Sequence, residues 1–560
     1  MTKPLLMKTV PEIIEYNAAA YGARDALVYV DRGLRLSHIE LDAMANRTAK
    51  ALLALGVKKG DHVAIWATNY PEWLYTFLGA AKIGAILVTV NTNYKIFELE
   101  YLMRQSDSKV LVFMKGLKDS HYPEIVSELL PEIAKQGNSL NLHSERLPLL
   151  NHIIYAPHDE SEAIPENYTS WQAFMALGDT VSDEELAAVR STLDCMEIIN
   201  MQYTSGTTGF PKGVMLTHHN IVNNGFFIGE NMRFTEDDRL CIPVPFFHCF
   251  GLVLAIMAAL THGAAMMPVD HYSPTAVLKV VEAEKCTALH GVPTMFIFEL
   301  EHPDFEKYDL SSLRTGIMAG SPCPIKVMQD VLEKMGMSEI VISYGQTESS
   351  PVTTMTNTED SVEKRVSTVG RVMPHTEIKI VDPETGETLG ANQQGELCVR
   401  GYCVMRGYYK MDEATSSAID VGGWLHSGDL ALMDEDGYFK ITGRIKDMII
   451  RGGENIYPRE IEELLYTNPK VQDVQVIGVP SKQFGEEVMA WVILREGEAM
   501  TEEECKDFVR KNMSRHKVPS FIHFTDSFPM TASGKIQKFK MREMAVELLQ
   551  LQNAEAIETA

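Results

Sequence analysis

The residues with the clearest chemistry form one short run that is rich in glycine and hydroxyl groups. The run consists of Thr204, Ser205, Gly206, Thr207, Thr208, Gly209, Phe210, Pro211 and Lys212. Glycine permits backbone conformations in which several amide N–H groups converge on one anion, and the hydroxyl groups add further donors. Lys212 adds a positive charge. We therefore predict that this run binds phosphate groups, with an ordinary polar hairpin as the alternative.

The sequence on either side of this run indicates which kind of phosphate loop it is. A Walker A loop has the pattern Gly-x-x-x-x-Gly-Lys-Ser/Thr and opens a helix. Here an apolar, strand-like stretch at 198–203 precedes the run, and the apolar residues 214–216 follow it. We therefore expect the loop to connect two strands, which excludes a Walker A site.

Further motifs follow along the chain in a fixed order. They are Tyr344-Gly345-Gln346-Thr347-Glu348, Trp424-Leu425-His426-Ser427-Gly428-Asp429, Gly443-Arg444-Ile445-Lys446-Asp447 and Ser533-Gly534-Lys535. Together with the first run they resemble the adenylate-forming superfamily of acyl-CoA synthetases, amino-acid adenylation domains and luciferases. The resemblance covers nearly the whole chain. The segment 451–458, Arg-Gly-Gly-Glu-Asn-Ile-Tyr-Pro, is most similar to the medium-chain fatty acyl-CoA synthetase branch.

This resemblance implies a reaction in two steps. A carboxylic acid attacks the α-phosphate of ATP to give acyl-AMP and pyrophosphate, and coenzyme A then gives acyl-CoA and AMP. Mg²⁺ and cationic side chains neutralise the phosphate charge. The expected cofactors are therefore ATP and Mg²⁺, with coenzyme A as a co-substrate. A standalone adenylation enzyme that loads a carrier protein, a luciferase-like oxygenase and a non-enzymatic scaffold are the alternatives.

The resemblance assigns the nucleotide to residues from several of these motifs. Glu348 is expected to bind Mg²⁺, and Thr347 to contact a phosphate. Tyr344 is expected to lie against the adenine, with a core tyrosine as an equal alternative. Asp429 would accept both ribose hydroxyls and Arg444 would reach ribose or phosphate, a turn cap and a surface ion pair being the plainer alternatives. The other adenine wall is expected to consist of Gly320, Ser321 and Pro322.

The C-terminal part of the chain is expected to move between the two steps. By resemblance, Lys535 bridges the acyl carboxylate and the α-phosphate in the first step and then withdraws as the tail turns about Lys446. The tunnel for the pantetheine arm of coenzyme A is assigned to Arg451, Gly452 and Gly453. A simple turn is the alternative for the two glycines.

A third group of residues is assigned by resemblance to the acid pocket. It comprises His248, Gly251, Leu252, Thr294 and Gly345, with His248 as a gate near the carboxylate and a packed core histidine as the alternative for it. The segment 246–253 contains no acidic residue to pair with a substrate ammonium group, so an apolar acid is favoured over a free amino acid. For Cys249 beside His248, we expect a single strand that points the two side chains to opposite faces, which excludes a nucleophile pair.

The elements that must position these residues follow from hydrophobic periodicity. Helix-like patterns at 39–55 and 73–83 alternate with strand-like patterns at 61–67 and 85–90, which predicts α/β layers with mostly parallel strands. The stretch 135–189 is weakly periodic and predicts loops. After His375, the strand-like stretches 377–381, 395–400 and 438–442 predict a small, antiparallel, barrel-like β subdomain.

The tail has its own alternation of elements. Helices are predicted at 459–465 and 501–513, and strands at 471–479 and 487–493. We therefore predict a large N-terminal domain over 1–443, a hinge at 444–447, and a small, mobile α+β domain over 448–560.

Composition narrows the classes of partner and compartment. The 560 residues include 76 acidic and 51 basic ones, a net charge of -25 that argues against nucleic acid as a partner. The eight cysteines form no CxxC pair, and their spacing indicates neither a disulfide framework nor a zinc site. No signal peptide is evident, and the apolar run 250–259 is too short to span a bilayer. We expect a cytoplasmic protein without an integral membrane segment, whose oligomeric state stays open, a homodimer included.

Overall fold

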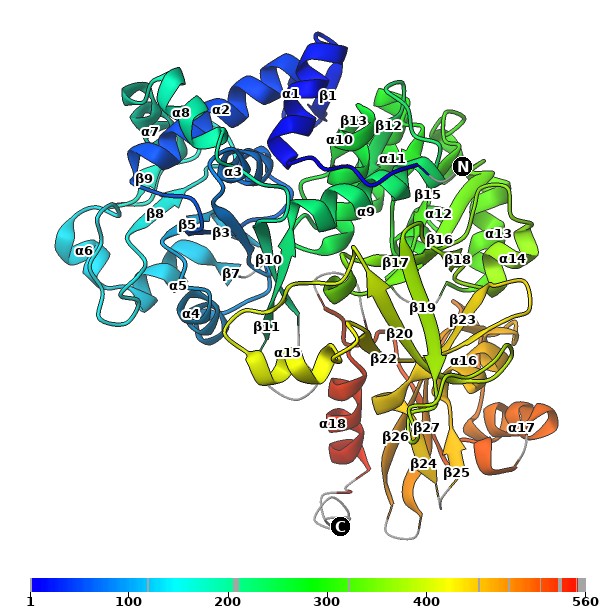
Figure 1. Cartoon of the computed structure of the whole chain (residues 1–560). Coiled ribbons are helices and arrows are strands. Elements are labelled where there is room, and N and C mark those ends of the chain that lie inside the picture. Colours follow the sequence, from blue (N-terminus) through cyan, green and yellow to red (C-terminus); the bar gives the residue numbers. More distant parts are fainter. Residues whose placement is uncertain are drawn as a thin grey trace.

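The large part of the chain is built on two sheets that lie side by side in a computed structural model (Figure 1). The structure describes residues 3–117, 120–204, 211–320, 323–451, 454–481, 484–513, 515–531, 536–549 and 551, and it gives the backbone alone at 446, 454 and 455. In the described residues, no helix is both long and apolar enough to cross a membrane.

The first sheet has eight strands in the order β21-β11-β10-β4-β3-β5-β8-β9. The strands from β10 to β9 are parallel, whereas β11 is antiparallel to both of its neighbours, β10 and β21. Their bounds are Gly407–Tyr408 (β21), Lys212–Thr217 (β11), Ile198–Thr204 (β10), Ile86–Thr89 (β4), His62–Trp66 (β3), Val110–Phe113 (β5), His152–Tyr155 (β8) and Thr169–Ser170 (β9).

The second sheet has nine strands in the order β18-β17-β16-β15-β14-β12-β13-β1-β2. The six strands from β16 to β1 are parallel, and the outer strands β2, β17 and β18 are antiparallel. Their bounds are Arg371–Val372 (β18), Val352–Met355 (β17), Glu339–Gly345 (β16), Thr315–Met318 (β15), Ala288–Leu289 (β14), Arg239–Ile242 (β12), Ala265–Pro268 (β13), Asp25–Tyr29 (β1) and Leu34–Ser37 (β2). The prediction of mostly parallel α/β layers is confirmed.

Helices cover and join the two sheets, and most begin at a residue that favours a helix start. Ser37 caps α2 in a capping box, and proline occupies the first turn of α1 and α3. Asn224 in α9 donates to the carbonyl of Val352 in β17 at 2.8 Å, so this helix ties the hairpin β10–β11 to the second sheet. The bounds are Val10–Tyr21 (α1), His38–Ala54 (α2), Pro71–Lys82 (α3), Ile96–Gln105 (α4), Tyr122–Leu129 (α5), Glu132–Gln136 (α6), Trp171–Leu177 (α7), Asp183–Arg190 (α8), His218–Asn231 (α9), Ala258–His262 (α10), Pro274–Glu284 (α11), Pro293–Leu300 (α12), Ile325–Lys334 (α13), Val362–Ser367 (α14) and Asp412–Ala418 (α15).

Two local predictions in this part of the chain are wrong. The stretch 135–189, predicted as loops, contains β8, β9, α7 and α8. Its helices are short, and Leu186 is the single buried residue of α8, so a periodic apolar face is missing from the sequence. His248 and Cys249 lie in no strand: they precede the π-helix Phe250–Met257 (η2), and the Cys249 sulfur lies 3.6 Å from Nδ1 of His248.

The predicted antiparallel β subdomain is a four-stranded sheet in the order β19-β20-β22-β23. Its strands are Thr376–Val381 (β19), Gly395–Gly401 (β20), Leu425–Met433 (β22) and Phe439–Arg444 (β23), all antiparallel to their neighbours. The short 3₁₀ helix Ile445–Asp447 (η5) follows β23 directly. This sheet therefore leads into the tail without a long linker.

The tail, at the bottom of Figure 1, has hydrophobic clusters of its own. These clusters draw on residues from Ile449 onward, as expected for a separately folded unit, although the boundaries 443, 447 and 448 stay a prediction. Its elements are Ile449–Arg451 (β24), Glu454–Ile456 (β25), Pro458–Tyr466 (α16), Val471–Ser481 (β26), Gly485–Leu494 (β27), Glu502–Asn512 (α17), Phe521–Phe524 (β28) and Lys538–Leu548 (α18).

Candidate active site

The glycine-rich run sits at the end of the β10–β11 hairpin. Thr204 and Lys212 face each other across its last antiparallel pair, which confirms that two strands flank the loop. Residues 205–210, which include Ser205, Gly206, Thr207, Thr208 and Gly209, lie outside the described residues. The hairpin is braced from the side by α4, where Tyr101 donates from its hydroxyl to the carbonyl of Pro211 at 3.1 Å.

Glu348 comes from the second sheet and meets this hairpin. It lies in the 3₁₀ turn Thr347–Ser349 (η4) that follows β16. Its Oε1 accepts a hydrogen bond from the hydroxyl of Tyr408 at 2.9 Å and a longer one from Thr204 Oγ1 at 3.4 Å. The Lys212 ammonium lies 4.8 Å from the centre of the Tyr408 ring. A carboxylate, two hydroxyls and an ammonium group therefore gather at the mouth of the predicted phosphate loop.

Tyr408 is a site residue that the sequence did not reveal. It lies on the edge strand β21 next to β11, where no motif or periodicity marks it. Burial raises the pKa of the Tyr408 hydroxyl, and the neighbouring Glu348 carboxylate acts in the same direction, so the hydroxyl stays protonated and donates to Glu348.

A second polar cluster joins Tyr344, Asp429 and Arg444. The Tyr344 hydroxyl donates to Asp429 Oδ2 at 2.6 Å, and Arg444 Nε lies 3.2 Å from Asp429 Oδ1. Asp429 and Arg444 are cross-strand partners in β22 and β23, so strand register brings them together. Burial raises the pKa of the Tyr344 hydroxyl, as does the Asp429 charge. Contact of the Tyr344 ring with an adenine stays a prediction.

Asp429 lies inside β22, in a bulge, and not in a turn between elements. Glu396 pairs with Leu430 and Cys398 with His426, so the three residues 396–398 of β20 face the five residues 426–430 of β22. Gly428 has a φ of 72° there, a conformation that favours glycine. Glu396 holds this bulge because its Oε1 accepts from the Gly428 N–H at 3.0 Å.

The segment before η2 that was assigned to the acid pocket is held by Asn69, another residue that sequence reasoning missed. Oδ1 of Asn69 accepts from the N–H of Phe246 at 2.8 Å, and Nδ2 donates to the carbonyl of Val244 at 3.1 Å. Gly251 packs tightly, since a Cβ there would lie 2.2 Å from the carbonyl oxygen of Pro245. Asn69 follows β3 in a polar stretch without any signal of this contact.

The other predicted pocket residues are placed separately. His248 is half-buried and its Nδ1 accepts from the N–H of Phe250 at 3.1 Å. Leu252 is fully buried in the main hydrophobic core. Thr294 is half-buried at the start of α12, and Gly345 is exposed at the end of β16. That these residues together line an acid pocket stays a prediction.

The predicted adenine wall is only partly described. Gly320, at φ 90°, follows β15 at an exposed position, while Ser321 and Pro322 lie outside the described residues. Thr347 is buried, and its Oγ1 lies 3.6 Å from the sulfur of Cys249.

In the tail, Arg451 forms an ion pair with Glu487 at 2.5 Å and lies over the ring of Phe484. The backbone of Lys446 lies in η5, whereas Gly452, Gly453 and Lys535 fall outside the described residues.

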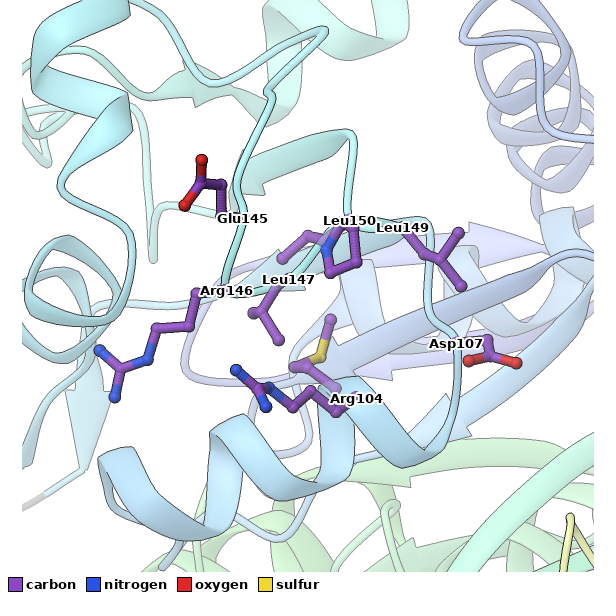
Figure 2. Close-up of a pocket in the computed structure, with 9 residues that line it drawn as sticks. Arg104, Asp107, Glu145, Arg146, Leu147, Leu149 and Leu150 are labelled. Carbon is purple, nitrogen blue, oxygen red and sulfur yellow. The ribbon is translucent and has the colours of Figure 1, made fainter.

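One cavity of about 290 Å³ lies elsewhere (Figure 2). Its walls include Arg104 and Asp107 from the end of α4 and the segment 145–150. Arg104 and Arg146 both pair with Glu100, at 3.1 and 2.6 Å. None of the site residues predicted from the sequence lines it, so this cavity is not the predicted acid pocket.

The two sheets, the phosphate hairpin and the Asp429 cluster together define a nucleotide-dependent α/β enzyme. The family model described as AMP-binding enzyme matches residues 14–409, and the model of the AMP-binding enzyme C-terminal domain matches residues 460–535. The chain therefore belongs to the AMP-binding enzyme family.

Relatives along the whole chain agree with this family. YngI of Bacillus subtilis (strain 168), which carries the name of an acyl-CoA synthetase, is 55% identical over 553 residues, 98% of this chain and 100% of that protein. The human mitochondrial medium-chain acyl-CoA ligase ACSF2 is 41% identical over 557 residues, 98% of this chain and 89% of that protein.

Solved structures share the fold. ATP-bound MatB from Rhodopseudomonas palustris superimposes with a TM-score of 0.82 at 28% identity, covering 96% of this chain and 99% of that one. The anthranilate CoA ligase AuaEII in complex with anthranoyl-AMP also reaches 0.82 at 28% identity, covering 98% and 99%.

Proposed function

We propose that this chain is an ATP-dependent, AMP-forming acyl-CoA synthetase whose acid is a medium-chain fatty acid. The acid attacks the α-phosphate of ATP, pyrophosphate leaves, and the thiol of coenzyme A then displaces AMP from the acyl carbon. One structural observation supports this proposal: Thr204, Lys212 and Glu348 lie close together at the end of the β10–β11 hairpin. The match to the AMP-binding enzyme family over most of the chain supports it as well.

The residues at the hairpin suit a triphosphate and its metal. Mg²⁺ prefers oxygen ligands, and Glu348 and Thr204 each supply an oxygen atom at this position. We propose that Glu348 holds the ion. The bound metal would neutralise charge on the phosphates. Lys212 lies on the same side and would face the departing pyrophosphate. Tyr408 holds the Glu348 carboxylate in place through its hydroxyl.

The Asp429 cluster suits the ribose. An ionised carboxylate only accepts hydrogen bonds, so it matches the two hydroxyl donors of a ribose. Tyr344 and Arg444 each contact one of its oxygens and thereby fix its orientation before the nucleotide arrives. Arg444, whose side chain is largely exposed, is free to turn toward ribose or phosphate.

We propose Lys535 as the cation of the first step. A substitution separates the two half-reactions: Lys535→Ala is expected to abolish formation of acyl-AMP but largely to spare thioester formation from acyl-AMP supplied ready-made. Pyrophosphate release measures the first step and acyl-CoA the second. Equal loss of both half-reactions would contradict the assignment.

The proposed acid follows from the apolar character of the segment before η2. Phe246 and Phe247 are buried, and no acidic residue occurs in 246–253 to balance a substrate ammonium group. The relatives named medium-chain ligases support the same chain length. A carrier-protein ligase and a luciferase-like oxygenase share the nucleotide motifs and are the competing functions.

One assay tests this proposal. Straight-chain acids from two to eighteen carbons, together with aryl acids, are incubated with ATP, Mg²⁺ and coenzyme A. We expect AMP, pyrophosphate and acyl-CoA in equal amounts, with the highest kcat/KM for medium chains. Release of ADP and phosphate would exclude the reaction class, and an optimum at short, long or aryl acids would overturn the substrate. A requirement for a carrier protein or for oxygen would favour the competing functions.

We propose that the chain is cytoplasmic. None of the eight cysteines, all of which lie among the described residues, forms a disulfide, which suits a reducing compartment such as the cytoplasm. The ACSF2 relatives are named mitochondrial. Fractionation of the source cells with an antibody to the chain distinguishes the two locations.

A further inference from the structure

The sheet that carries Asp429 also gathers three side chains of the kinds that bind zinc in proteins: a carboxylate, a thiol and an imidazole. Glu396 and Cys398 lie two residues apart on β20 and therefore project from the same face. His426 lies directly opposite Cys398 on β22. One donor atom from each of the three lies within 4.8 Å of the others. The Cys398 side chain is buried, while the ring of His426 is 35% exposed, so an ion could enter from the solvent side.

The distances suit a small ion with tetrahedral geometry. The Cys398 sulfur lies 3.5 Å from His426 Nδ1, and Glu396 Oε2 lies 2.8 Å from the same nitrogen. With Zn–S near 2.3 Å and Zn–N near 2.0 Å, tetrahedral ligand atoms lie roughly 3.5 Å apart. The Cys–His pair already has this separation, and the Glu396 carboxylate needs to move outward by less than about 1 Å.

A carboxylate behind the histidine completes the arrangement. Asp420 Oδ2 lies 3.8 Å from Nε2 of His426, on the far side of the ring from the cluster. The other oxygen of Asp420 is fixed, because it accepts from the N–H groups of Gly422 and Trp424 at 2.8 and 2.9 Å. Histidine ligands of metals commonly donate their second N–H to such a carboxylate, which fixes the tautomer that leaves the first nitrogen free to bind. At 3.8 Å the two groups are beyond hydrogen-bond distance, so the ring must shift toward Asp420 for this contact to form.

We propose that Glu396, Cys398 and His426 form a binding site for a zinc-class divalent cation, with a fourth position open to water. The site is separate from the proposed Mg²⁺ position at Glu348. Thiolate and imidazole ligands select zinc-like ions, whereas Mg²⁺ requires oxygen ligands, so the Mg²⁺ that accompanies ATP does not compete for it.

Occupation of this site also changes the nucleotide site, a consequence that rests on the proposed function. Glu396 holds the bulge of β22 through the N–H of Gly428, the neighbour of Asp429. A metal ion that draws the Glu396 carboxylate outward weakens this hydrogen bond and loosens the segment that presents Asp429. Bound zinc therefore inhibits by raising the KM for ATP.

Cobalt binding tests the site without any assay of activity. The full chain, freed of metal with a chelator, is titrated with Co²⁺. We expect one ion per chain, with the absorption bands of tetrahedral cobalt and of thiolate-to-cobalt charge transfer. Cys398→Ser should lose the thiolate band, and His426→Gln should weaken binding at least tenfold. Cys195→Ser is the matched control and should keep both bands, because Cys195 is the one partly exposed cysteine.

The outcomes decide the proposal. Absence of the thiolate band in the unaltered chain, or its persistence in Cys398→Ser, overturns the site. Circular dichroism and the melting temperature without metal show whether each variant is folded. If both Cys398→Ser and His426→Gln are misfolded, displacement of Co²⁺ by Zn²⁺ and protection of Cys398 from alkylation by bound Zn²⁺ decide instead, and lack of protection overturns the site.

A second measurement tests the inhibition. Acyl-AMP formation is followed at fixed Mg²⁺ and increasing Zn²⁺. We expect the KM for ATP to rise several-fold in the unaltered chain and in Cys195→Ser, but not in Cys398→Ser. Equal inhibition of all three chains contradicts the coupling to Asp429, whereas a chain without any acyl-AMP formation contradicts the proposed function and leaves the cobalt result as the test of the site.

Discussion

At the scale of single residues, the contact between Tyr344 and Asp429 gives a tyrosine of the site a second role. The sequence suggested an aromatic face for the adenine, and the structure adds a hydroxyl that orients the carboxylate at 2.6 Å. The contributions of the Tyr344 ring and of its hydroxyl can be measured separately, because replacement by phenylalanine keeps the ring and removes the hydroxyl.

We predict that Tyr344→Phe raises the Kd for ATP roughly tenfold. Hydrogen bonds to charged groups contribute about 1.5–3 kcal/mol, and about 1.4 kcal/mol corresponds to a factor of ten. Isothermal titration with ATP measures the change. If the ring also contacts adenine, Tyr344→Leu should weaken binding further; equal values for Phe and Leu would show that the hydroxyl alone matters. An unchanged Kd in both variants would falsify the orienting role.

Glu72, in the first turn of α3, makes stability depend on pH. Burial raises the pKa of its carboxyl from 4.5 to about 7, although nearby Arg32 acts in the opposite direction. Its Oε2 is buried and has no hydrogen-bond partner among the described residues. Between these pH values the folded chain binds more protons than the unfolded chain. The contribution of Glu72 to the stability of the folded chain is therefore greatest below pH 4.5 and is lost as the pH rises through about 7.

We predict that Glu72→Gln removes this loss. The free energy of unfolding of the variant minus that of the unaltered chain should be larger at pH 8 than at pH 5 by on the order of 2–3 kcal/mol. The reason is that an amide of the same shape stays uncharged at both pH values. Melting temperatures at the two pH values measure the difference. Glu184→Gln, at an exposed position of α8, is the control and should show none. A gain that is the same at both pH values would contradict the titration of Glu72.

At the scale of elements, the segment between β12 and η2 depends on a single side chain from the loop after β3. Asn69 accepts from Phe246 and donates to Val244, so its amide needs both an acceptor and a donor. The segment leads directly to His248, the proposed gate of the acid pocket. The order of the segment and the binding of the acid are therefore expected to change together.

We predict that Asn69→Asp both destabilises the segment between β12 and η2 and weakens binding of the acid. Aspartate keeps the acceptor for Phe246 but turns an oxygen toward the Val244 carbonyl, which costs on the order of 2–3 kcal/mol at a buried position. The melting temperature should fall, and the KM for the acid should rise more than the KM for ATP. Asn93→Asp, at an exposed position in the loop after β4, is the control. Equal rises in both KM values would indicate a general loss of structure.

The short helices of the N-terminal part show what periodicity misses at this scale. The patterns at 39–55 and 73–83 gave α2 and α3 because each presents an extended apolar face to the core. By contrast, α8 buries Leu186 alone and is fixed at its start by the capping box of Ser182 and Glu185. A helix held mainly by its cap leaves little apolar pattern to detect.

At the scale of the whole molecule, the tail is joined to the large part through β23 and η5. Gln472 in the tail approaches Glu301 of the large part at 3.4 Å, the kind of weak polar contact that a rotation can break. A turn of the tail about Lys446 would bring Lys535 to the acyl-adenylate in one step and remove it in the next.

We predict that Lys446→Pro slows thioester formation at least tenfold while acyl-AMP formation changes little. Proline fixes φ near −65° and so restricts the rotation that the second step needs. Single-turnover assays of the two half-reactions measure this split. Lys440→Ala, on β23 at an exposed position before the hinge, serves as the control. Full thioester formation in Lys446→Pro would exclude this hinge.

The sequence by itself determined which chemical groups are present and the local elements that carry them. Glycines and hydroxyls in 204–212 gave a loop between strands, and β10 and β11 confirm it, because strand and turn preferences are local. The motif order gave the family, which the family models confirm. The eight scattered cysteines gave no sign of a metal site, because spacing along the chain reveals only ligands that are close in sequence.

The tertiary structure decided which groups meet. Glu348 reaches Thr204 across 144 residues and Tyr408 across 60, and Asp429 faces Arg444 because of the register of two strands. The cluster of Glu396, Cys398 and His426 likewise exists only because β20 pairs with β22 in one register and a bulge absorbs two residues. A shift of one residue would turn these side chains to the other face, and that register is set by packing across the whole sheet.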